Sequence, residues 1–154
     1  MSSLRAVLLV LLPALLAGGC ASSKELWAEA TYRNLSYSSL YGVVLTTIDA
    51  EGYPVRMRDP QRGSVETEWV YGMSNAVVRG PARRKVFATI EPLDDGTGYL
   101  VRMRVAEEVI PKGGILNMNP RESEDWEPYK DNFDIAEYLM AKVAALLSEN
   151  RVSP

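Results

Sequence analysis

The most definite chemistry in this 154-residue sequence belongs to Cys20, its only cysteine. With no second cysteine the chain forms no internal disulfide, and a free thiol is a liability in an oxidising compartment. Ala17, Gly18 and Gly19 precede it, and such small residues let a chain enter a peptidase cleft in extended form. Cleavage directly before Cys20 would make it the first residue of the mature chain. Its thiol could then be joined to a diacylglyceryl group through a thioether. We therefore predict that Cys20 is a lipid attachment point and not a metal ligand or a nucleophile.

Histidine is missing from the whole sequence. Its absence removes the commonest general base near neutral pH and the commonest metal ligand. Once Cys20 is acylated, no thiol remains either. A Ser-His-Asp triad, a Cys-His dyad and a conventional zinc site are therefore excluded. We predict a protein that is not an enzyme and that has no catalytic residue, no metal and no cofactor.

Carboxylates are the remaining groups that could act as acids, bases or ligands. Glu107 and Glu108 are neighbours in a predicted strand, so their side chains point to opposite faces and cannot converge. Glu107 lies on the face of that strand that otherwise carries apolar residues, so it could be an acid with a raised pKa. We favour the alternative that the strand end turns into solvent there. Asp94-Asp95 next to Gly96 is typical of a hairpin turn and has too few ligands for a calcium loop. The other acidic candidates are Glu122, Glu124, Asp125 and Glu127.

The first 19 residues have the layout of a secretory signal peptide, with Arg5 before an apolar run from Ala6 to Leu16. This run is shorter than the roughly 20 apolar residues that span a bilayer. With Gly18 and Gly19 it resembles the lipobox of bacterial lipoproteins, although Ala17 replaces the more usual leucine. The resemblance implies a lipid anchor at Cys20. The alternative is an ordinary secreted protein cut near Ala17 or Ala21.

In the sorting rule that belongs to the lipoprotein resemblance, aspartate directly after the cysteine retains the protein at the inner membrane. Ala21 occupies that position here, so the expected location is the outer membrane, facing the periplasm. We predict a lipidated tether over residues 20–34 and a single domain over residues 35–150, because the remaining length suits one ordinary domain. The net charge of −3 gives no reason to expect a nucleic-acid partner.

The periodicity of apolar residues predicts helices at both ends of this domain. One helix spans 35–50, with Ser38 or Ser39 as its cap and Gly52 just beyond its end. The other runs from a cap at Asp131 or Asn132 to about residue 149. The segments 72–81 and 111–129 are predicted loops.

Between the helices, apolar and polar residues alternate. This alternation predicts four strands, over 53–58, 65–71, 84–91 and 99–110. Pairing Ile90 with Val101 and Ala88 with Met103 keeps one face apolar. In the first hairpin Arg56 would lie opposite Glu66, with Val55, Met57 and Trp69 on the apolar face. The predicted fold is α+β: a four-stranded antiparallel sheet with an N-terminal and a C-terminal helix packed on one face.

The stretch Ala50-Glu51-Gly52-Tyr53-Pro54-Val55, followed by Gly63 and the strand Ser64-Val65-Glu66-Thr67-Glu68-Trp69, resembles the helix-grip domains of BamC, a lipoprotein of the β-barrel assembly machinery. In that family a helix leads into a strand that begins with glycine and an aromatic residue. The resemblance covers about residues 40–109. It implies a non-enzymatic accessory or scaffolding lipoprotein.

Three surface features are candidate partner sites. The first is basic and comprises Arg56, Arg58, Arg102 and Arg104, with Arg79, Arg83, Arg84 and Lys85 near one loop. It could meet anionic lipid headgroups or acidic cell-wall polymers, or be a solvated sheet face interleaved with glutamates. The second is Trp126, with Tyr129 and Phe133, which could anchor a protein partner or pin the loop to the core. The third is Trp27 with Tyr32, which could rest at the lipid interface.

These features together predict a membrane-anchored periplasmic lipoprotein that binds or scaffolds an envelope protein in envelope assembly or maintenance. One alternative is a carrier of a small apolar ligand or lipid, in a cavity lined by Tyr53, Trp69, Tyr71 and Met103. The other is a carboxylate-based hydrolase of envelope glycans, which needs two carboxyls about 5 to 9 Å apart.

Overall fold

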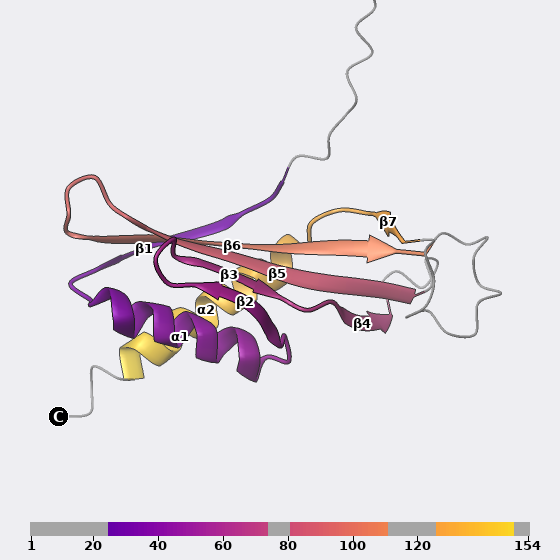
Figure 1. The fold of residues 1–154 in the computed structure, drawn as a ribbon, viewed down its shortest axis with the longest axis horizontal. Coiled ribbons are helices and arrows are strands. Elements are labelled where there is room, and N and C mark those ends of the chain that lie inside the picture. The colour runs from indigo at the N-terminus through magenta and orange to yellow at the C-terminus, as the bar shows by residue number, and fades with distance from the viewer. Residues whose placement is uncertain (1–24, 74–80, 111–125, 150–154) are drawn as a thin grey trace, which may run out of the picture.

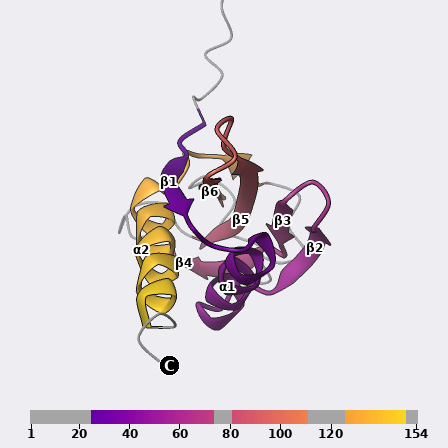
Figure 2. The same cartoon turned by 90° about the vertical axis from the view of Figure 1, so that its left-hand side faces the viewer.

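Two helices lie against one face of an antiparallel sheet in the computed structural model, which describes residues 25–73, 81–110 and 126–149 (Figures 1 and 2). The strands are β1 (Ala28–Arg33), β2 (Val55–Asp59), β3 (Ser64–Thr67), β4 (Val70–Met73), β5 (Pro81–Pro92), β6 (Gly98–Val109) and β7 (Glu127–Pro128). Their order is β1-β6-β5-β3-β2, with β4 also paired to β5 and β7 to β6. The α+β class is confirmed, but the sheet of the described residues has 7 strands, more than the four predicted.

Helix α1 (Tyr37–Ala50) confirms the predicted N-terminal helix. Its cap is Ser36, whose hydroxyl accepts a hydrogen bond from the Ser39 backbone N–H at 3.2 Å, and not Ser38 or Ser39. Gly52 follows the helix at φ 84°, where a side chain would be strained. The face toward the sheet carries fully buried Leu40, Val44 and Ile48.

Helix α2 (Phe133–Glu149) confirms the predicted C-terminal helix. The side chain of Asn132 accepts a hydrogen bond from the Ile135 backbone N–H at 3.3 Å and caps the first turn. The predicted apolar stripe is buried against β1, β6 and α1, through Ala136, Leu139, Met140, Val143 and Leu147.

The hairpin of β5 and β6 is the centre of the sheet. Its register pairs Ile90 with Val101 and Ala88 with Met103, as predicted. All four side chains are buried on the face covered by the helices. The apolar alternation of these two strands therefore builds the core.

Strand β1 lies within the segment that we predicted to be tether. Ala28, Ala30 and Tyr32 turn toward the core and Glu29 turns away, and the strand pairs with β6 along its length. The tether prediction for residues 28–33 is therefore wrong. Two alanines give a weak apolar signal, which explains why the strand was not predicted.

Two irregularities change which side chains face the core. A register shift between Val55 and Met57 leaves Met57 49 % exposed, although we predicted it on the apolar face, and pairs Met57 with Glu66 where Arg56 was expected. A second shift separates β3 from β4, because Glu66 pairs with Phe87 while Val70 pairs with Arg84. One extra residue in an antiparallel pair turns the following side chains to the other face.

Asp95 in the loop between β5 and β6 is held as an anion. Its carboxylate lies 2.8 Å from Arg33 Nη1 and accepts a hydrogen bond from the Thr97 backbone N–H at 2.9 Å. These contacts hold the pKa of Asp95 well below its ordinary value of 3.8, and the hydrogen bond from Arg33 is the largest cause. Because the folded pKa is lowered, this contact stabilises the fold above the unfolded pKa and is lost as pH falls through the folded value.

We expect the Asp95 carboxyl carbon, followed by NMR through an acid titration, to show a midpoint below the ordinary aspartate value. In the variant Arg33→Gln the midpoint should rise toward that value. A wild-type midpoint at or above it would contradict the assignment.

Candidate functional site

Within residues 25–73, 81–110 and 126–149, no helix covers the other face of the sheet, which we call the open face (Figures 1 and 2), and this face carries paired charges. Four cations project from β5 and β6 on this face, and each lies close to at least one carboxylate. The pairs are Arg83 Nε–Glu108 at 2.7 Å, Lys85–Glu66 at 2.8 Å, Arg102 with Glu29 at 2.9 Å and Glu91 at 3.3 Å, and Arg104 with Asp131 at 2.8 Å and Glu25 at 2.5 Å. These contacts neutralise the cations, so this face offers little net attraction to an anionic polymer.

Aromatic rings stack on the cations at one end of this face. The Arg83 guanidinium lies 4.6 Å from the ring centre of Trp69 and 4.6 Å from that of Trp126, so it contacts two indoles. Tyr71 meets Trp126 edge-on, with ring centres 5.8 Å apart. We name Trp69, Tyr71, Arg83 and Trp126 the aromatic–cation cluster.

The second register shift creates this cluster. We predicted Trp69 on the apolar face with Val65, but the extra residue between β3 and β4 turns its ring to the open face, beside Arg83 and Lys85. Tyr71 is the register partner of Arg83 on β5. Trp69 was therefore assigned to the wrong face, because a bulge leaves no mark in an alternating sequence.

Trp126 reaches the cluster from the segment that covers the edge of β6. Glu127 and Pro128 pair with the end of β6, and the Tyr129 backbone N–H donates to the carbonyl of Glu107 at 2.9 Å. Trp126 thus stacks on the open face and is half-buried there, rather than pinned in the core. Each cation–π contact contributes roughly 0.5 to 2 kcal/mol, so Arg83 holds two segments together.

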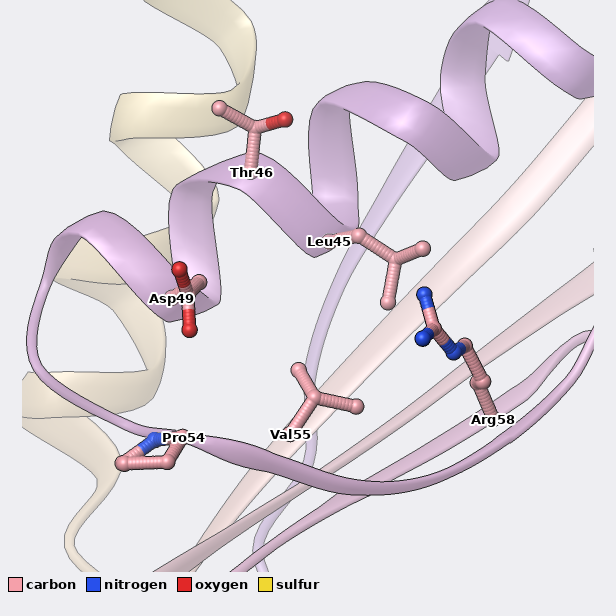
Figure 3. Close-up of a pocket in the computed structure, with 6 residues that line it drawn as sticks. All are labelled: Leu45, Thr46, Asp49, Pro54, Val55 and Arg58. Carbon is pink, nitrogen blue, oxygen red and sulfur yellow. The ribbon is translucent and has the colours of Figure 1, made fainter.

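The other predicted surface residues divide between locations. Arg102 and Arg104 lie side by side on the open face. Arg56 lies on the outer strand β2, with its side chain 58 % exposed and 3.7 Å from Glu66. Arg58 points toward α1 and lines a surface pocket of about 380 Å³ with Leu45 (Figure 3). Arg56 and Arg58 therefore do not share one surface with Arg102, Arg104 and Trp126.

A buried polar network lies on the opposite, helix-covered side of the sheet. Glu107 is 6 % exposed and accepts hydrogen bonds from Arg84 Nε at 2.7 Å and Asn132 Nδ2 at 3.0 Å. Our expectation that this end of the strand turns into solvent is wrong, because Arg84 compensates the buried charge. Burial raises the pKa of the nearby Tyr53 phenol, with Arg84 acting in the opposite direction.

The carboxylates of β6 are engaged in ion pairs. Glu107 and Glu108 point to opposite faces, as predicted, and each lies against its own arginine. The part of the chain that the structure describes contains no cluster of His, Cys, Asp and Glu that could hold a metal ion. Cys20, Arg79, Glu122, Glu124 and Asp125 lie outside the described residues.

The aromatic residues expected to line a carrier cavity do not share one. Met103 is buried in the core, and Tyr53 packs against the core on the helix-covered side of the sheet. Trp69 and Tyr71 lie with Arg83 on the open face. Tyr32, which we considered for the lipid interface, packs against the core cluster. The predicted lining of a carrier cavity is therefore divided by the sheet.

Comparison with protein-family models and with curated protein sequences finds no match. Across residues 25–73, 81–110 and 126–149, neither helix is long and apolar enough to cross a membrane.

Proposed function

We propose that this chain is a lipid-anchored envelope protein, attached to the outer membrane through Cys20 and facing the periplasm, that binds a partner protein in envelope assembly or maintenance. Its role is non-enzymatic, and the two-helix, one-sheet domain works as a helix-grip-like scaffold. The open face of the sheet is the binding surface.

The aromatic–cation cluster is the observation that carries the binding proposal. Trp, Tyr and Arg are the residues most enriched at the energetic centres of protein interfaces. Here Arg83 contacts two indoles and is paired with Glu108, so these side chains lose little freedom on binding. Tyr71 is 36 % exposed and offers its ring to a partner. A preorganised aromatic surface with paired charges suits a protein ligand better than an anionic polymer.

The anchor proposal predicts the behaviour of Cys20→Ser. This change removes the only thiol, so the protein should move from the membrane fraction to the soluble fraction or remain unprocessed. Cell fractionation followed by mass spectrometry of the N-terminal peptide measures both outcomes. Wild-type protein should carry acyl chains on Cys20, and unchanged membrane extraction of Cys20→Ser would reject lipidation.

Crosslinking in native membranes followed by mass spectrometry tests the binding proposal. One envelope protein joined to the open face would support it. Co-purified lipid with no protein partner would favour the carrier instead.

A further inference from the structure

The folded domain begins much closer to Cys20 than the predicted tether allows. Glu25 already contacts the domain, since one carboxylate oxygen lies 2.5 Å from Arg104 Nη1. The next residue, Leu26, donates its backbone N–H to Asp131 at 2.8 Å. Only residues 21–24 lie between Cys20 and Glu25, so the chain between these two positions spans at most about 18 Å in any conformation.

Apolar and aromatic side chains gather where the chain enters the domain. Leu26 is 40 % exposed and Phe133 is 36 % exposed, although both are large and apolar. Asp131, whose side chain is only 7 % exposed, ties the two segments together because it accepts the Leu26 amide hydrogen bond. We name these side chains the anchor-side patch: Leu26, Trp27, Tyr129, Lys130 and Phe133.

The composition of this patch suits the interface of a bilayer. Leucine and phenylalanine bury apolar surface in the acyl boundary, while tryptophan and tyrosine prefer the headgroup level. Lys130 is exposed, and its ammonium lies 5.6 Å from the centre of the Tyr129 ring, so a positive charge accompanies the aromatic residues. A single cation adds only about 1 kcal/mol of attraction to anionic lipid, so apolar contact dominates.

We propose that the anchor-side patch rests on the bilayer surface and fixes the orientation of the domain. This inference rests on the proposed lipid anchor at Cys20. A linker of a few residues gives an effective concentration in the millimolar range, so even weak contact is populated. The indigo N-terminal end of the described chain leaves at the β1 edge of the sheet (Figures 1 and 2). This edge therefore faces the membrane, and the sheet face that carries the aromatic–cation cluster stays accessible to a partner.

Lipid-depth quenching tests the orientation. Acylation consumes the only native thiol, so a cysteine introduced into the lipidated protein takes an environment-sensitive dye at one place. Leu26→Cys and Phe133→Cys report on the patch, and Met57→Cys is the matched control because Met57 is an exposed apolar residue on β2, at the opposite edge of the sheet. The proteins are reconstituted in phosphatidylethanolamine and phosphatidylglycerol vesicles that contain a headgroup-proximal spin-labelled lipid.

We expect at least about twofold stronger quenching at positions 26 and 133 than at position 57, because only the patch meets the lipid. With the dye at Lys130→Cys, the pair Leu26→Ser and Phe133→Ser should reduce the quenching, and Met57→Ser should not. Equal quenching at positions 26, 133 and 57 on vesicle-bound protein would show that the patch does not rest on the bilayer, while the proposed lipid anchor would still stand. Protein that does not float with vesicles at all would overturn both.

Discussion

Replacing Glu107 by alanine is expected to lower the free energy of unfolding by about 3 kcal/mol, the largest single effect on stability that we predict. The change leaves the Arg84 guanidinium, whose side chain is only 18 % exposed, without its carboxylate. It also removes the acceptor of the Asn132 amide, next to the start of α2. Urea unfolding of a soluble form that begins at Ala21 measures the difference, since the midpoint should fall without a change in slope.

The double variant Arg84→Met with Glu107→Leu is the control for this prediction. It removes both charges, and apolar replacement of a buried ion pair is often neutral or stabilising. Arg84 Nη2 is buried and forms no hydrogen bond to a described residue, which makes the wild-type pair an incompletely satisfied one. We therefore expect the double variant to recover most of the loss. If Glu107→Ala unfolds at the wild-type midpoint, the carboxylate is solvated and our account of this network is wrong.

Replacing Trp126 by alanine is expected to have the largest effect on binding. Truncating a residue at the centre of an interface costs 2 kcal/mol or more, which corresponds to roughly a 30-fold loss of affinity. Arg83 keeps its pairing with Glu108 in this variant, so the domain should stay folded with a loss of only about 1 to 2 kcal/mol. Recovery of the crosslinked partner from native membranes, normalised to the amount of protein, measures the effect.

The matched control for Trp126→Ala is Tyr138→Ala. Tyr138 is also an aromatic residue, 47 % exposed, but it lies on α2 and binds Glu51. Partner recovery should be unchanged in this variant. Equal losses in both variants would indicate a general effect of stability and would argue against the open face as the binding surface.

The parts of the fold that could be predicted from the sequence are those in which apolar residues recur at a regular spacing over the whole element. The stripe of α2 and the alternation of β5 and β6 involve many buried side chains, and the resulting pairing of Ile90 with Val101 is confirmed. Strand β1 was missed because alanine is only weakly apolar, although Ala28 lies in the core and Ala30 packs against it. Its pairing with β6 depends on residues far along the chain, which local patterns do not reveal.

The candidate site was harder to predict because bulges decide it. The predicted alternation placed Met57 and Trp69 in the core. One extra residue in β2 and another between β3 and β4 turned both side chains to the other face. Trp126 was chosen from the sequence for its aromatic character, but its partner Arg83 was grouped only with a basic loop. The alternation of Arg83, Lys85 and Phe87 along β5 could have placed Arg83 on the face away from the helices, but it gives no sign of the contact with Trp126.

Photocrosslinking from Tyr71 in intact cells tests the central claim most directly. A photoreactive amino acid at position 71 lies within the aromatic–cation cluster, whereas the same group at the exposed position Thr46 lies on α1, on the other side of the molecule. We predict one discrete envelope protein joined to position 71, none joined to position 46, and a strong loss of the product when Trp126→Ala is added. Equal products from both positions, or none from position 71 in protein shown to be folded and anchored, would contradict the account.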